Sequence, residues 1–239
     1  MTPSLLSGRY LCPMPLSTQP PGRVLTAKFR RWRRHLLLAT GSVLGVALLA
    51  LSFHGPLRER ISLASAYVAL GLLAVTLSLG PLNVLRGRPN PVSFNLRRDF
   101  GIWSAVLGVA HTAIGLTVHF TGRMQLYFLP PPDQRGLLGL RADPFGAANH
   151  TGLLAVLLLL LLAAISNDLS LRRLGTARWR AVQRWSYVLL ALTVAHGALY
   201  QILEKQRLIL VGLFASMALG VLTLQLARWR RVREIGPLG

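Results

Sequence analysis

The sequence predicts an all-α fold: a polytopic membrane bundle of six transmembrane helices. The 239-residue chain has a mean hydropathy of +0.48 and only 14% charged residues, whereas about 25% is usual for soluble domains. Its apolar residues gather in runs close to the ~20 residues needed to cross the hydrocarbon core. We place the runs at residues 35–53, 61–82, 99–120, 145–166, 184–203 and 207–227.

The two ends of the chain differ in composition from this apolar part. Residues 1–34 are rich in Pro, Ser and Arg, and no apolar run long enough for a signal-peptide core precedes the basic cluster at 28–34. We therefore expect a disordered basic cytoplasmic tail over 1–34, with the run 35–53 acting as an uncleaved signal anchor. The transmembrane domain is expected to span 35–230, and 231–239 form a second cytoplasmic tail.

The distribution of basic residues predicts the orientation of the bundle. The chain has 27 Lys and Arg against 7 Asp and Glu, and most of the basic residues fall in the two tails and in the connections after the second and fourth runs. By the positive-inside rule both termini are cytoplasmic, and the third and fifth runs cross in the same direction. Because the basic residues flank apolar runs instead of forming a stripe with interleaved aromatics, we expect lipid, and no nucleic acid, as the partner.

Two of these runs carry a histidine in their interior. His111 lies thirteen residues after Arg98 and His196 twelve residues after Arg184, so each histidine is at nearly the same distance from a basic residue at the beginning of its run. On parallel helices the two imidazoles would lie at one depth, in the outer half of the membrane. Ionisable residues at that depth are costly and mark functional sites, and two facing neutral imidazoles are the axial ligands that a b-type haem iron needs. For either histidine alone, a hydrogen bond between helices remains the alternative.

Gly108 and Gly115 share the helix face of His111. Missing side chains there would leave a flat slot for the edge of a porphyrin, but close packing between helices explains the two glycines equally well. The lone Cys12 and the absence of CxxC and CxxCH motifs leave only non-covalent haem.

The other histidines are weaker candidates. His35 starts the first run at the cytoplasmic edge, and His54, His119 and His150 lie at the outer ends of runs. The three outer histidines could hold a metal, bond haem propionates or supply protons, although interfacial placement is the commoner explanation. No nucleophile–base pair or dinucleotide fingerprint appears, so the chain has no complete active site of its own, and whether it counts as an enzyme stays open. Electrons must come from another protein, a quinol or a small flavin.

The Arg97-Arg98 entry before His111 and the segment LGTARWRAVQRWSYVLLALTVAHGALY, with His196 near its end, resemble the ferric-reductase-like transmembrane domain family. The likeness covers roughly 35–230 and implies a six-helix haem protein of the bacterial inner membrane. It also implies electron flow outward from a cytoplasmic flavin reductase or the quinone pool. Within the family, the chain is similar to the haem-binding membrane subunit of the periplasmic methionine-sulfoxide reductase system, in which a periplasmic molybdopterin enzyme accepts the electrons.

One departure from the family bears on the number of haems. Double-haem members have further histidines near the cytoplasmic ends of the same helices, where this chain has Arg97 and Gln183. The resemblance therefore implies one haem b. Arg97, Arg98, Gln183 and Arg184 could hold the phosphate of FMN or a quinone headgroup, but contact with lipid phosphate is the favoured reading.

These observations predict a b-type cytochrome that moves electrons from a cytoplasmic flavin or quinol donor to an extracytoplasmic acceptor. Two rival hypotheses stay open. In one, the protein is an outward-facing ferric or cupric reductase. In the other, it is a haem-free accessory subunit that packs within a larger membrane complex.

Overall fold

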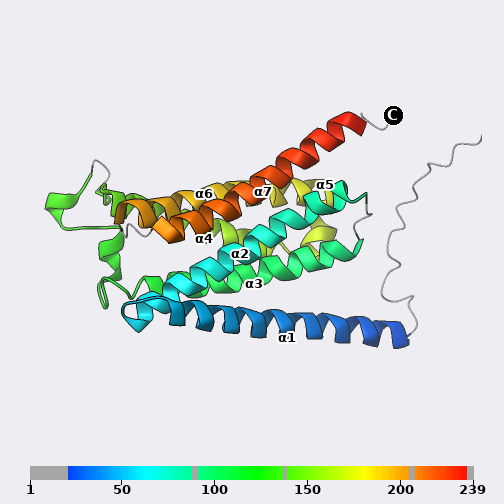
Figure 1. The fold of residues 1–239 in the computed structure, drawn as a ribbon, viewed down its shortest axis with the longest axis horizontal. Coiled ribbons are helices and arrows are strands. Elements are labelled where there is room, and N and C mark those ends of the chain that lie inside the picture. Colours follow the sequence, from blue (N-terminus) through cyan, green and yellow to red (C-terminus); the bar gives the residue numbers. More distant parts are fainter. Residues whose placement is uncertain (1–20, 88–90, 137–138, 205–207, 236–239) are drawn as a thin grey trace, which may run out of the picture. The chain divides into compact units, whose positions relative to one another are not determined.

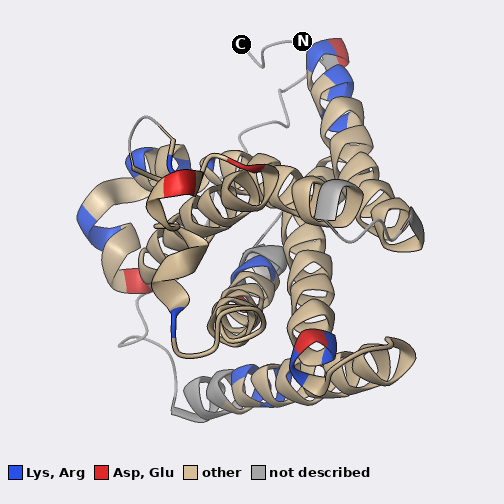
Figure 2. Ribbon diagram, turned by 90° about the vertical axis from the view of Figure 1, so that its left-hand side faces the viewer, with Lys and Arg blue, Asp and Glu red and all other residues tan. Residues whose placement is uncertain are grey.

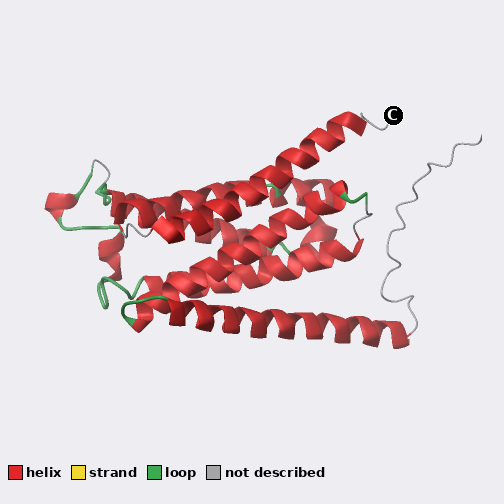
Figure 3. Cartoon of the chain, in the orientation of Figure 1, coloured by secondary structure: helices red, strands yellow, loops and turns green. Residues whose placement is uncertain are grey.

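The computed structural model describes residues 21–87, 91–136, 139–204 and 208–235, and within these ranges every regular element is a helix (Figures 1 and 3). The chain divides into two units, Met1–Leu37 and Leu38–Gly239. The helices are α1 (Pro21–Ser52), α2 (Leu57–Leu85), α3 (Pro91–Gly115), η2 (Met124–Tyr127), η3 (Pro132–Gln134), α4 (Pro144–Ala164), α5 (Asp168–Gln183), α6 (Ser186–Ala198), η4 (Leu199–Glu204) and α7 (Leu208–Ile235).

The predicted tails coincide only in part with the described residues. Residues 1–20 and 236–239 lie outside the description, while 21–34 belong to α1 and 231–235 to α7. The helix α1 thus begins well before His35, where the first apolar run starts.

The pair α2 and α3 forms one side of the second unit, and α7 packs on α2. Ser104 Oγ of α3 donates to the carbonyl oxygen of Ala69 in α2 at 2.9 Å. The buried hydroxyl of Tyr67 in α2 donates to the carbonyl oxygen of Leu210 in α7, also at 2.9 Å. Because few polar partners exist among apolar helices, such bonds fix which faces meet.

The other side of this unit consists of α4 and α6, which pack on each other, and α3 joins it through α4. The helix α4 starts at a well-formed cap: Pro144 occupies its first turn, and Asp143 Oδ1 accepts from the backbone N–H of Gly146 at 2.7 Å. Beyond α6 the chain continues for six residues as a π-helix, η4. This local widening changes which residues share a face with the end of α6.

A polar helix, α5, connects α4 to α6. It is capped by Asn167, whose side chain accepts from Ser170 N–H, and Gly175 interrupts it with φ 72° and ψ 161°. A backbone angle of that sign is open to glycine at little cost. Trp179 Nε1 donates to the carbonyl oxygen of Ile165 at 3.0 Å, which holds α5 against the end of α4.

Four helices of the described residues are long and apolar enough to cross a membrane, and most of the helical ribbon carries no charged residue (Figure 2). By their length and composition, these helices indicate a multi-pass membrane protein. The four segments are Phe29–Ser52, Leu57–Leu85, Pro144–Ala164 and Ile209–Glu234.

Within the described residues, the helices of the third and fifth predicted runs are not both long and apolar enough to count among these membrane-spanning candidates. The helix α3 includes Arg97, Arg98 and Asp99 and ends at Gly115, short of the expected end at Phe120, while α6 has only 13 residues before η4 begins. The count of six spans and the cytoplasmic placement of both termini therefore stay predictions.

Candidate functional site

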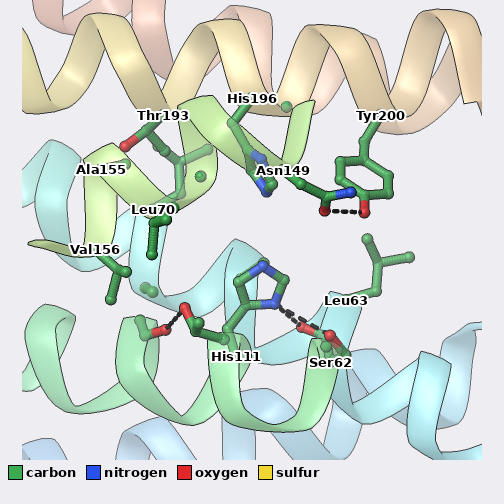
Figure 4. A pocket seen from close by; sticks show the side chains of 18 of the residues that line it. Ser62, Leu63, Leu70, His111, Asn149, Ala155, Val156, Thr193, His196 and Tyr200 are labelled. Atoms are coloured by element: carbon green, nitrogen blue, oxygen red, sulfur yellow. Dashed lines mark hydrogen bonds between the residues drawn. The ribbon is translucent and has the colours of Figure 1, made fainter. Parts of the chain in front are cut away.

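The structure brings His111 of α3 and His196 of α6 together. Their ring centroids lie 6.1 Å apart with the planes at 71°. Both imidazoles line a cavity of about 290 Å³ between α2, α3, α4 and α6. Figure 4 shows the two rings pointing toward one another from opposite walls of this cavity.

The Nδ1 atom of each ring is held by a backbone carbonyl of a neighbouring helix. His111 Nδ1 lies 2.8 Å from the carbonyl oxygen of Ser62 and 3.2 Å from its hydroxyl, and His196 Nδ1 lies 2.8 Å from the carbonyl oxygen of Ala148. A carbonyl oxygen only accepts, so Nδ1 carries the proton in both rings. The Nε2 lone pair is then free to bind a metal, and the carbonyl bond fixes the ring orientation as it does in metal-ligating histidines.

The separation of the rings suits one ion between them. Metal–nitrogen bonds to imidazole are about 2.0–2.1 Å long, and the centre of a ring with ~1.33 Å bonds lies roughly 1.1 Å from each nitrogen. Two imidazoles on opposite sides of one ion therefore have centroids roughly 6.2 Å apart. The observed 6.1 Å is close to this value.

The donor set also narrows the kind of metal centre. Among the described residues, no group of three or more His, Cys, Asp or Glu could hold a metal ion. Two imidazoles alone do not complete a structural zinc site, which has four protein ligands. They do fit an iron whose other coordination positions a porphyrin fills, so the residues present fit haem.

The cavity wall changes character along its length. Most of the wall is apolar, and the hydroxyls of Ser104, Thr112 and Thr193 within it are bonded to backbone carbonyl oxygens. Other polar side chains gather at the end where α2 and α4 begin and where α3 and η4 end, which we call the loop end. Ser62, Asn149, Tyr200 and Gln201 lie there. The apolar wall is lined by Leu70, Leu73, Ala155, Val156, Leu159 and Leu189.

A third glycine, which the sequence analysis missed, lies closest to a ligand candidate. A Cβ added at Gly152 of α4 would be 2.7 Å from His196 Nδ1, so only glycine lets α4 approach this ring. At Gly108 an added Cβ would meet Leu159 Cδ2 at 2.6 Å, and at Gly115 it would meet Ser62 Oγ at 3.3 Å. These two glycines therefore stand at close helix contacts, and both also line the cavity.

Arg97 and Gln183, the two candidates for binding a flavin or quinone, are not joined by a hydrogen bond or ion pair in the described part of the chain. Gln183 Nε2 donates to Ser166 Oγ at 3.0 Å. Arg97 lies within electrostatic range of Tyr187 and Arg228 instead. Its neighbour Arg98 pairs with Asp168 of α5.

The three outer histidines do not gather into a metal-binding group among the described residues. The ring of His119 packs edge-on against Phe145, with centroids 5.6 Å apart. His150 Nε2 donates to the carbonyl oxygen of Arg141 at 3.3 Å, and His54 is exposed. Of the three, only His119 lines the cavity.

Apolar helices of membrane length and two imidazoles facing each other across an internal cavity are the features of a multi-pass membrane electron-transfer protein. The comparison of sequences agrees with this class. Residues 65–194 match the sequence profile of the family described as ferric reductase like transmembrane component, and the chain belongs to that family. The matched region includes His111 and ends just before His196. No solved structure matches the chain.

Proposed function

We propose that this protein is a b-type cytochrome that holds one haem b between His111 and His196 and carries electrons across the membrane. The observation that carries the proposal is the 6.1 Å separation of the two rings, each with its Nδ1 atom bonded to a carbonyl oxygen of another helix. Membership of the ferric-reductase-like family supports the same role.

Each part of the site has a task in this proposal. The Nε2 atoms of His111 and His196 would hold the haem iron. The bound haem iron supplies reversible one-electron transfer. The carbonyls of Ser62 and Ala148 keep Nδ1 protonated and the rings oriented, and the apolar wall excludes water, which tunes the potential of the site.

The proposal also assigns a direction and partners. In it the protein lies in a bacterial inner membrane, takes electrons from a cytoplasmic flavin reductase or the quinone pool, and delivers them to an extracytoplasmic partner. The segment from Leu174 to Tyr200 resembles the haem-binding membrane subunit of the periplasmic methionine-sulfoxide reductase system, called MsrQ, and this resemblance supports a methionine-sulfoxide reductase as the acceptor. Within the described residues no hydrogen bond or ion pair joins Arg97 to Gln183, so we favour contact with lipid phosphate over FMN or quinone binding by these two residues.

The test of haem ligation is the oxidised-minus-reduced absorbance spectrum of the detergent-purified protein, with a pyridine-haemochrome assay for stoichiometry. We expect a low-spin b-type spectrum and about one haem per chain. His111→Ala and His196→Ala should each lose the haem yet remain in the membrane. His54→Ala is the matched control, because His54 is exposed and does not line the cavity. Full haem retention in both single ligand variants would overturn the assignment, and a colourless wild type would favour the accessory-subunit hypothesis.

A second experiment addresses the acceptor. Pre-reduced protein is mixed in turn with a periplasmic methionine-sulfoxide reductase and with chelated Fe(III) or Cu(II), and haem oxidation is followed by absorbance. We expect fast oxidation by the reductase. Fast oxidation by the metal chelates alone would instead identify a ferric or cupric reductase.

A further inference from the structure

The geometry points to a carboxyl-binding subsite at the loop end of the cavity, built from Asn149, Tyr200 and Gln201, that takes a propionate group of the haem. This inference rests on the proposed function, because it concerns the occupant of the same cavity. It adds the direction in which the haem lies: propionates toward the loop end and the apolar edge toward the leucines of the wall.

The first observation is a pair of buried polar atoms without partners. Asn149 Nδ2 and Gln201 Oε1 make no hydrogen bond within the described residues. The two residues are only 9% and 5% exposed, and both line the cavity. A donor or acceptor that loses its hydrogen bonds to water on burial and finds no new partner destabilises the protein. A polar group of the occupant that bonds to both atoms would remove this cost.

The second observation is the arrangement that directs these atoms. Tyr200 donates from its hydroxyl to Asn149 Oδ1 at 2.7 Å (Figure 4), so the acceptor of this amide is occupied, and Nδ2 is its atom without a partner among the described residues. Tyr200 itself lies against His196, with ring centroids 5.1 Å apart. The subsite is therefore built directly beside one of the two ligand candidates.

The third observation is the π-helix. Gln201 follows His196 by five residues, and in a regular α-helix a residue at that spacing turns away from the face of the first. Because Leu199–Glu204 is π-helical, with bonds that span five residues, Gln201 returns to the cavity wall that His196 and Tyr200 also line. π-Helical turns are rare and occur often at functional sites, and this one brings a second amide to the cavity.

The chemistry of the wall favours a carboxyl group as the occupant of this subsite. One free amide donor and one free amide acceptor match the carbonyl and the hydroxyl of a protonated carboxyl group. The described residues that line the cavity include no Lys, Arg or Asp, and apart from its histidines and tyrosines Glu59 is the one ionisable acid or base among them. An ionised carboxylate would find no cation there, so the neutral acid is the form that this wall accommodates.

The test compares haem b with its dimethyl ester, in which both carboxyl groups lack the acidic proton. Protein is loaded with either compound during expression in haem-auxotrophic cells, and the release of the compound to an excess of a haem-scavenging protein is followed by absorbance. Gln201→Leu should accelerate release of haem b roughly 3- to 10-fold, as expected for a lost hydrogen bond. Release of the dimethyl ester should change less than about twofold. Tyr200→Phe should accelerate release of both compounds, because it frees the Asn149 amide to turn and the ester keeps the carbonyl that this amide would meet.

The controls separate the subsite from general damage. Gln134→Leu makes the same chemical change at an exposed position of η3 and should leave both release rates unchanged. If Gln201→Leu does not fold, Gln201→Met supplies the comparison. Equal acceleration for both compounds in the Gln201 variant, or none for either, would overturn the subsite and leave a bridging water as the partner of the two amides. That failure is distinct from failure of the proposed function, in which the wild type holds no low-spin haem at all.

Discussion

Gly152 lies against the imidazole of His196 so closely that a Cβ at position 152 would be 2.7 Å from Nδ1 and 2.8 Å from Cε1. The same Nδ1 atom is bonded to the carbonyl oxygen of Ala148, one turn earlier on the same helix. The ring is thus held from α4 by a hydrogen bond and by a missing side chain together. It cannot retreat from an added methyl group without losing that bond.

Gly152→Ala should therefore displace the His196 ring and remove most of the low-spin haem signal. The matched control is Gly220→Ala in α7, where an added Cβ would have nothing within 4 Å. There alanine should be neutral or stabilising, since it favours the helix by about 1 kcal/mol over glycine. Haem content by pyridine haemochrome measures both effects. A wild-type haem content in Gly152→Ala would contradict this prediction, because it would mean that the His196 ring can move away from the added methyl group and still bind haem.

Tyr67→Phe should destabilise the contact between α2 and α7. The buried Tyr67 hydroxyl is bonded to the carbonyl oxygen of Leu210 at 2.9 Å, and hydrogen bonds between membrane helices are worth about 0.6 to 2 kcal/mol. Thermal unfolding in detergent would show a lowered midpoint. Tyr187→Phe is the control, because its bond to Gln225 is longer, at 3.2 Å, and exposed. An equal decrease of the unfolding midpoint in the two variants would contradict the expectation that the buried hydrogen bond of Tyr67 stabilises the protein more than the exposed one of Tyr187.

Cysteine labelling in intact cells tests the predicted topology. Cys12 is the only native cysteine, so Cys12→Ser gives a background without thiols. Gln134→Cys and Arg178→Cys then place single thiols at exposed positions in the two connections that should lie on opposite sides. A membrane-impermeant maleimide should label position 134 from outside and position 178 only after lysis. The reverse pattern would invert the orientation, and labelling of both from outside would contradict six spans.

Gln183→His should leave the haem content at about one per chain. The family resemblance places a second-haem ligand at this position in double-haem relatives, but its counterpart here is Arg97, which is no iron ligand. The variant would also exchange a side chain that is bonded to Ser166 Oγ at 3.0 Å. The pyridine-haemochrome ratio decides the matter. Two haems in the wild type would mean that another ligand pair exists.

The long apolar helices were predictable from composition, and α5 was not. The runs 61–82 and 145–166 correspond to α2 and α4 with shifts of up to four residues at their ends, and the run 207–227 corresponds to α7, which continues eight residues further, to Ile235. The helix α5 falls in a segment that the sequence analysis used only for its basic charge, because a polar helix broken at Gly175 leaves no apolar run. Likewise, the part of α1 before His35 was not predicted to be helical, because its basic residues interrupt the apolar pattern.

The site was predictable only where it depends on single helices. The positions of His111 and His196 along their own runs predicted their common depth, and the structure brings the rings together. Gly152, Asn149 and Gln201 were missed because their roles depend on how α4 pairs with α6 and on the π-helical turn, neither of which leaves a periodic signal in the sequence. The short polar stretch Asn149-His150-Thr151 and the pair Tyr200-Gln201 inside apolar runs were the available hints.

The two hydrogen bonds from Nδ1 to a backbone carbonyl belong to different halves of the helix bundle. The bond from His111 to Ser62 lies wholly within the α2–α3 hairpin, and the bond from His196 to Ala148 lies wholly within the α4–α6 pair. Each half can orient its own imidazole before it meets the other. A ligand that binds both rings is then thermodynamically linked to the joining of the halves, so its binding free energy appears as cohesion of the folded protein. During biogenesis, cofactor supply would set how much of the newly inserted chain reaches its final assembly.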